Sequence, residues 1–352
     1  MTTTQNWRTE ESGFMAQIQF DTSSARKTLV GCDLSGYNLI GADLAGANLS
    51  QAKLRGADLS GADLSSSNLT ECDLTGAILS GVDLYQADLR GARLNGVQMD
   101  HCDATSANFS DANLSGAQMA QSCLSSAVFD KATMTACNLF NCDLSSARFF
   151  MAKMSGSVLV KANLTDADLN SAKLFGANLD EAVLTGTSLR NSDLNSASLR
   201  GAKVENADFL KTSMFCADAS QSSIVTSSFE TANLRGIKLV GSDLSGSGLA
   251  GADLSNAMLS RSNFTGSSLE EGVLWAARVS GAILQDANVK AANLRATGLH
   301  KSFALSEFPD LQFSEQTIWD EKIYKRRAIS ASHARTIENE AKKRSFFSRL
   351  FG

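Results

Sequence analysis

One class of residue recurs at every fifth position of the chain from Leu29 to Leu299. Of these 55 frame positions, 38 are Leu, 15 are Met, Phe, Ile or Val, and only Ala104 and Ala219 are small. The residue two positions earlier is usually small, and it is Ala in 31 cases. A repeat this regular predicts one elongated body, although a length of 352 residues would otherwise suggest two or three globular domains.

A five-residue period fits neither an α-helix nor a continuous strand. In a helix, five residues advance the chain by about 500°, so the frame residues would spread over every face. In a strand, residues five apart point to opposite faces. The small residue and the frame residue, which are two apart, share one face of a short extended segment, and the chain must then turn. Gly, Asn, Asp and Ser crowd the position two after the frame residue, as a corner requires.

The spacing of the larger frame residues predicts how many segments close one coil. Met134, Met154 and Met214 are separated by multiples of twenty residues. Five of the six Phe residues at frame positions are also separated by multiples of twenty: Phe109, Phe129, Phe149, Phe209 and Phe229. Phe264 is the exception. This spacing favours four units per coil, and at about 4.8 Å per coil the rod would be about 65 Å long.

The run A(D/N)L, seen at residues 42–44, 57–59 and 162–164, resembles the repeats of the pentapeptide repeat proteins. The resemblance covers about three quarters of the chain. It implies a mainly β protein, a right-handed four-sided parallel β-helix with Leu and the small residue pointing inward. It also implies a non-enzymatic role, since the family is known for DNA-mimicking gyrase inhibitors and for effectors delivered into host cells.

The repeat and its flanks divide the chain into four expected parts. Residues 1–28 would cap the first coil, residues 29–303 would form the β-helix, residues 304–321 would close its other end, and residues 322–352 would form a basic amphipathic helical tail. The closing loop would lay Phe308, Phe313 and Trp319 over the last coil. A homodimer contact through the same apolar residues is the alternative.

Charge separates the body from the tail. Within a net charge of −5, residues 29–299 carry −8 and residues 322–352 carry +7. The tail residues predicted to dock are Lys342, Lys343, Arg344, Phe346, Phe347, Arg349, Leu350 and Phe351. They suit an anionic membrane surface or a partner groove, and the alternative is a helix folded back on the acidic rod. Without a targeting segment or a long apolar run, the chain is expected to be cytoplasmic, with the tail as its route to the inner membrane surface.

The chain shows no pattern of residues that would carry out catalysis or bind a cofactor. His101, His300 and His333 are scattered, there is no CxxC pair, and no phosphate-binding Gly motif occurs. Five of the seven Cys occupy the small-residue position, where they are expected to be reduced core residues. We therefore predict no enzyme, no cofactor, no metal and no direct binding of nucleic acid.

Two surface patterns carry the functional hypotheses. Many Asp residues stand just before the frame residue, where they can bond the corner backbone, and Lys and Arg on the body are expected to interrupt any negative stripe. Aromatic residues that follow the frame residue predict a docking wall: Phe140, Phe150, Phe175, Phe215 and Trp275. The favoured function is therefore a scaffold that binds a protein partner along this wall. A gyrase-inhibiting DNA mimic and a secreted effector are the alternatives.

Overall fold

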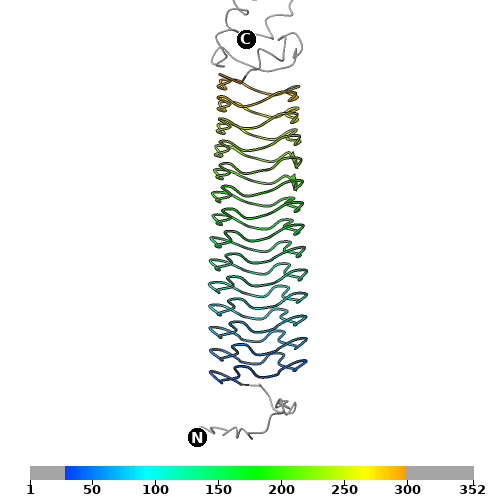
Figure 1. The fold of residues 1–352 in the computed structure, drawn as a ribbon, viewed down its shortest axis with the longest axis vertical. Helices are drawn as coiled ribbons and strands as arrows, with labels where there is room; N and C mark the ends of the chain where they lie inside the picture. Colours follow the sequence, from blue (N-terminus) through cyan, green and yellow to red (C-terminus); the bar gives the residue numbers. More distant parts are fainter. Residues whose placement is uncertain (1–27, 298–352) are drawn as a thin grey trace, which may run out of the picture.

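The chain winds into a column of stacked coils. The fold comes from a computed structural model that describes residues 28–297, and Figure 1 shows these residues as coils stacked along one axis. The predicted four-sided parallel β-helix is confirmed. The predicted caps, the last residues assigned to the repeat and the tail helix lie outside the described residues.

One coil takes twenty residues, in four units of five. Every isolated bridge joins two parallel segments at residues twenty apart, from Thr28 with Asn48 to Val273 with Asn293. At one place the pairing lengthens into named strands, where β1 (Lys203–Glu205) lies parallel to β2 (Ser223–Val225). Residues twenty apart therefore stack, as the spacing of the large frame residues predicts.

The four sides of the column are numbered here in chain order. Face 1 contains Leu29 and each frame residue twenty further on, and faces 2, 3 and 4 begin in the same way with Leu34, Leu39 and Leu44. Faces 2 and 4 are opposite sides of the column. Residues ten apart therefore lie on opposite sides.

Almost every backbone amide of a unit has a backbone partner, as the unit from Asp58 to Ala62 shows. Asp58 N donates to the preceding coil at Tyr37 O (2.9 Å), and Leu59 N donates to the following coil at Ile78 O (2.7 Å). Gly61 N and Ala62 N also donate to carbonyl oxygens, at 3.0 Å each. The remaining amide, that of Ser60, donates to Asp58 Oδ1 at 3.0 Å. The acidic residue before the frame Leu thus completes the hydrogen bonding of the corner.

The corners require left-handed backbone. Each residue two positions after a frame residue, from Gly31 to Ala296, has a φ between 50° and 71°. Of these residues 21 are Gly, and 33 are not. The predicted role of Gly at the corners is confirmed, and the non-Gly corners show that the stacked coils hold this conformation even where it costs about 1 kcal/mol or more.

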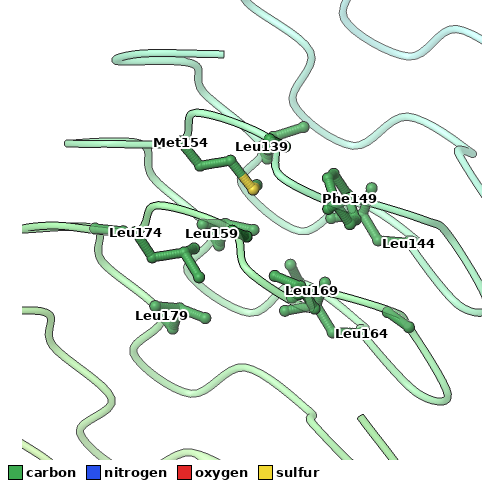
Figure 2. Packing of buried hydrophobic residues seen from close by; sticks show 14 of the residues in the cluster. Leu139, Leu144, Phe149, Met154, Leu159, Leu164, Leu169, Leu174 and Leu179 are labelled. Atoms are coloured by element: carbon green, nitrogen blue, oxygen red, sulfur yellow. The ribbon is translucent and has the colours of Figure 1, made fainter. Parts of the chain in front are cut away.

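The frame residues fill the interior. From Leu29 to Leu294 none is more than 8% exposed, and Figure 2 shows them pointing inward, with Phe149 above Leu169 and Met154 above Leu174. Frame aromatics stack between coils, with ring centroids 4.9 Å apart for Phe109 and Phe129. The two small exceptions fall close to frame Phe residues: Ala104 is one unit before Phe109, and Ala219 lies between Phe209 and Phe229. This placement balances the volume within the column.

Four of the five Cys at the small-residue position are buried, and Cys32 is half-buried. Burial raises the pKa of the buried thiols to about 12: Cys72, Cys102, Cys137 and Cys142. A thiol with such a pKa carries almost no thiolate at neutral pH. These residues are packing residues of the core. Cys123 and Cys216 are exposed.

Candidate functional site

All five aromatic side chains predicted to form the docking wall are exposed. Their exposed fractions are 37% for Phe140, 39% for Phe150, 55% for Phe175, 47% for Phe215 and 48% for Trp275. Each follows a frame residue directly and therefore stands at a corner. The expectation that these side chains point outward is met.

Four of these aromatics border one face. Phe175, Phe215 and Trp275 share the corner between faces 2 and 3, and Phe150 lies on the corner between faces 1 and 2. Phe140 does not belong with them, because it precedes Phe150 by ten residues and so lies on the diagonally opposite corner, between faces 3 and 4. We call face 2 together with its two corners the face-2 wall.

The middle of the face-2 wall carries three lysines. Lys153 and Lys173 are partners in a parallel bridge between adjacent coils, and both are exposed. Lys131 stands at the neighbouring corner, where its backbone N donates to Phe150 O at 2.8 Å. None of the three forms an ion pair with any residue that the structure describes. We call Lys131, Lys153 and Lys173 the basic patch.

Lys153 and Lys173 stand directly before a frame residue, a position where Asp or Asn in other units accepts a hydrogen bond from a corner amide. Asp or Asn before the frame residue accepts a hydrogen bond from the amide two residues on, as Asp168 does from Asn170 N (2.9 Å). An ammonium group cannot accept that bond, so Lys153 and Lys173 stand where a corner acceptor is absent. The patch is not among the residues predicted from the sequence, and the signal that reveals it is the charge of residues twenty apart.

The N-terminal part of face 2 is neutralised by ion pairs. Lys53 Nζ lies 3.6 Å from Asp33, and Arg93 and Arg55 lie 3.8 and 3.9 Å from Asp73. Burial alone would raise the pKa of Asp73, but hydrogen bonds from Thr75 and the charges of the two arginines outweigh burial and lower it. Face 2 thus changes along the rod, from paired charges to unpaired lysines.

The opposite face carries a column of carboxylates. Asp43, Asp63, Asp83 and Asp103 follow one another in bridged pairs on face 4, and we call them the acidic column. Each also bonds its corner, as Asp83 Oδ1 does by accepting from Tyr85 N at 2.8 Å. The expectation that cations interrupt any negative stripe is wrong for this face. The cations of residues 43–103 all lie on the face-2 wall: Lys53, Arg55, Arg90 and Arg93.

The remaining predictions concern metal ligands, membrane-spanning segments and the tail. Within residues 28–297, no group of three or more His, Cys, Asp or Glu side chains is placed to hold a metal ion. The same stretch contains no helix of the length and apolarity needed to cross a bilayer. The tail residues predicted to dock, from Lys342 to Phe351, lie outside the described part of the chain, as do His300 and His333.

Comparison with known proteins identifies the repeat. A family model for pentapeptide repeats matches in eight copies, over residues 29–65, 67–103, 107–145, 142–180, 172–209 and 227–266. These matches cover more than half of the chain. No curated protein matches the chain in a sequence search.

Solved structures of other repeat proteins are similar to this chain. HetL, a pentapeptide repeat protein involved in heterocyst differentiation regulation from the cyanobacterium Nostoc sp. strain PCC 7120, is 28% identical. That match covers 66% of this chain and 89% of HetL, with a TM-score of 0.31. QnrB1, a plasmid-mediated fluoroquinolone resistance protein, is 17% identical over 67% of this chain and 93% of its own, with a TM-score of 0.25. With TM-scores this low, the assignment rests on the repeat match.

Proposed function

Since the chain belongs to the pentapeptide repeat family, we propose that it is a non-enzymatic scaffold that binds a protein partner along the face-2 wall. The family fold is a right-handed four-sided β-helix, which agrees with the expectation drawn from the repeat. The proposal includes the tail residues 342–351 as a second attachment, to the same partner or to an anionic membrane surface.

The observation that carries this proposal is the row of exposed aromatics along face 2. Phe175, Phe215 and Trp275 lie on one edge of this face, and each is about half exposed. The interior needs none of them, because the frame residues fill the column without their help. Large exposed aromatic side chains gathered along one side favour a contact surface, since aromatics dominate the binding energy of protein interfaces.

The test compares two sets of surface aromatics. Phe175→Ser with Phe215→Ser should reduce recovery of the partner in affinity capture from an extract of the source cells. Phe140→Ser is the matched control, because it removes the same kind of side chain from the diagonally opposite corner. Both variants should melt within a few degrees of the parent, because only exposed atoms are removed. Equal recovery by all three proteins would contradict the proposal.

The role of the tail has its own test. Removal of residues 328–352 should abolish flotation with phosphatidylglycerol vesicles or reduce partner recovery, because it removes most of the tail's basic and apolar residues. Full-length protein on neutral phosphatidylcholine vesicles is the control for charge. If the shortened protein behaves like the parent in both assays, the tail has no docking role.

The acidic column favours a second candidate, a DNA-mimicking inhibitor of gyrase. Four carboxylates stacked about 4.8 Å apart form a regular negative stripe along one side of a narrow rod. The purified protein should then inhibit supercoiling by gyrase at micromolar concentration or below. Asp63→Asn, Asp83→Asn and Asp103→Asn together should relieve inhibition, because Asn keeps the corner bond and removes the charge. No inhibition by the parent would discard this candidate.

A further inference from the structure

We infer that the basic patch is a docking site for a short acidic segment of a protein partner, one that also carries apolar side chains. The inference rests on the proposed function and deepens it, because it names the chemistry of the partner at the same wall. It is carried by three features of the patch: its unpaired charge, its apolar surroundings and its bounded length.

The first feature is charge that the fold does not need. Four of the eight cations that stand directly before a frame residue form ion pairs: Lys53, Arg93, Arg148 and Lys238. Lys153 and Lys173 form none with any described residue, and they are the two unpaired cations of this set that lie in adjacent coils. Like charges directly opposite one another in paired strands are destabilising. This arrangement weakens the fold locally and leaves two ammonium groups free to bind an anionic group.

The second feature is the apolar surface around these lysines. Phe150 and Met151, at 39% and 49% exposed, stand three and two residues before Lys153. Phe175, at 55% exposed, stands two residues after Lys173. An ammonium group flanked by exposed aromatic and aliphatic side chains on both corners suits a ligand in which carboxylates alternate with apolar groups.

The third feature is the length of the patch. Asp111 precedes Lys131 by one coil on the same corner, and Asp193 follows Lys173 by one coil on face 2. The lysines thus span two coil spacings, about 10 Å, which is the length of about three residues of extended chain. A polynucleotide would continue past the patch onto these carboxylates and along a body of charge −8. A short acidic peptide segment can end within the patch, so it avoids repulsion by the flanking carboxylates and by the negative body.

The test measures binding of defined probes to the full-length protein by fluorescence anisotropy. The main probe is a labelled twelve-residue peptide in which glutamate alternates with leucine or phenylalanine, and its partner probe has glutamine in place of each glutamate. We expect the glutamate peptide to bind about tenfold more tightly than the glutamine peptide, with a difference that shrinks as salt is added. A single-stranded DNA of twelve nucleotides and phosphatidylglycerol vesicles are the competing probes.

The variants separate this patch from positive charge in general. Lys153→Glu with Lys173→Glu should weaken binding of the glutamate peptide about tenfold or more, because two attractions become repulsions. Lys203→Glu is the matched control, since Lys203 stands in the same place before a frame residue, exposed and without an ion pair among described residues, but on face 4. It should change the affinity less than about twofold. Melting curves of both variants confirm that the rod is intact.

Three results would overturn the inference: equal binding of the glutamate and glutamine peptides, an equal loss in Lys203→Glu, or tighter binding to DNA or vesicles than to the glutamate peptide. Failure of the proposed function gives a different result. If partner capture depends on Phe175 and Phe215 but not on Lys153 and Lys173, the scaffold proposal holds and the acidic-segment inference is wrong. If capture depends on none of the four, both are wrong.

Discussion

Faces 2 and 4 share one backbone and one interior, yet their surfaces differ. On both faces the frame residues are buried and the bridges join residues twenty apart. Face 4 stacks four aspartates between residues 43 and 103, whereas face 2 stacks Lys153 on Lys173 and is edged by aromatics. In each unit two residues point inward and three point outward, so the fold fixes the interior and leaves each face free to carry its own chemistry.

The two faces differ also in how far the fold explains them. Each aspartate of the acidic column bonds a corner amide, for instance Asp63 Oδ1 with Ser65 N at 2.9 Å. A structural role therefore accounts for the aspartates, and their charge comes with it. Lys153 and Lys173 on face 2 supply no acceptor to a corner and form no ion pair with any described residue. For this reason the basic patch is stronger evidence of binding than the acidic column, although it has fewer charges.

The largest effect should come from putting a charge inside the column beneath face 4. Leu164 is completely buried, and Leu164→Asp should lower the free energy of unfolding by about 4 kcal/mol or more, because a carboxylate there has no partner. Asn163→Ser, one residue earlier and pointing outward, should cost only about 1 kcal/mol, because it changes surface hydrogen bonds with Asp143 and Thr165. Chemical denaturation monitored by circular dichroism measures both. Similar losses in the two variants would break the division between interior and surface.

A smaller effect should come from the corners that join the faces. Gly46 has a φ of 62° and open space where a Cβ would lie, so Gly46→Ala should lower the free energy of unfolding by about 1 kcal/mol through backbone strain alone. Ala136, at an equivalent corner beside face 2, has a φ of 56°, and Ala136→Gly should stabilise the protein by a few tenths of a kcal/mol. If the two corners are equivalent, the melting temperature should fall in Gly46→Ala and rise in Ala136→Gly. Changes of the same sign would contradict this.

Neutralising one aspartate on each face should change stability in opposite directions. Asp73→Asn removes the charge that pairs with Arg55 and Arg93, so it should lower the free energy of unfolding by about 0.5 kcal/mol. Asp63→Asn relieves repulsion between neighbouring carboxylates and should raise it by a similar, salt-dependent amount of about 0.5 kcal/mol. The melting temperatures of the two variants and the parent at low and high salt measure these changes, which should shrink as salt is added. If both variants are less stable than the parent, repulsion between the carboxylates of the acidic column does not destabilise the fold.

The smallest effect concerns pH. The folded-state pKa of Asp73 lies below its ordinary value of 3.8, so its ion pairs contribute fully to stability above that pH and lose their contribution as the pH falls below it. The parent and Asp73→Asn should therefore differ in melting temperature at pH 6, and the difference should shrink as the pH falls below 3.8 and through the lowered folded-state pKa of Asp73. A difference that stays constant however far the pH falls below 3.8 would show that the charge of Asp73 is not responsible.

Much of the interior could be predicted from the sequence, because the frame residues obey one rule without an insertion. The positions of Phe109, Phe129 and Phe149 alone indicate a coil of twenty residues, and their rings stack as that coil requires. The surface was harder to predict, because it needs the register of every outward residue and not only of the large ones. Phe140 and Phe150 both follow a frame residue, which predicts one wall, but a separation of ten residues places them on opposite corners.

The charge pattern was missed for the same reason. Net charge summed along the chain mixes four faces: Lys53 and Arg93 stand between aspartates in the sequence, but those aspartates lie on the opposite side of the column. Grouping the residues whose numbers differ by multiples of twenty shows both the acidic column and the stacked Lys153 and Lys173. No such rule exists for the chain before Leu29 or after Leu299, where the five-residue frame is absent.

The central feature of the molecule is that residues twenty apart stack on one face. Spin labels at Asp63→Cys with Lys203→Cys, and at Asp63→Cys with Asn263→Cys, measure it directly by pulsed dipolar spectroscopy once the accessible thiols of Cys32, Cys123 and Cys216 are removed by replacement with Ser. The account predicts distances of about 34 and 48 Å, for seven and ten coils of about 4.8 Å. Distances of about 45 and 64 Å, the values for three units per coil, or distances that do not grow with sequence separation would contradict it.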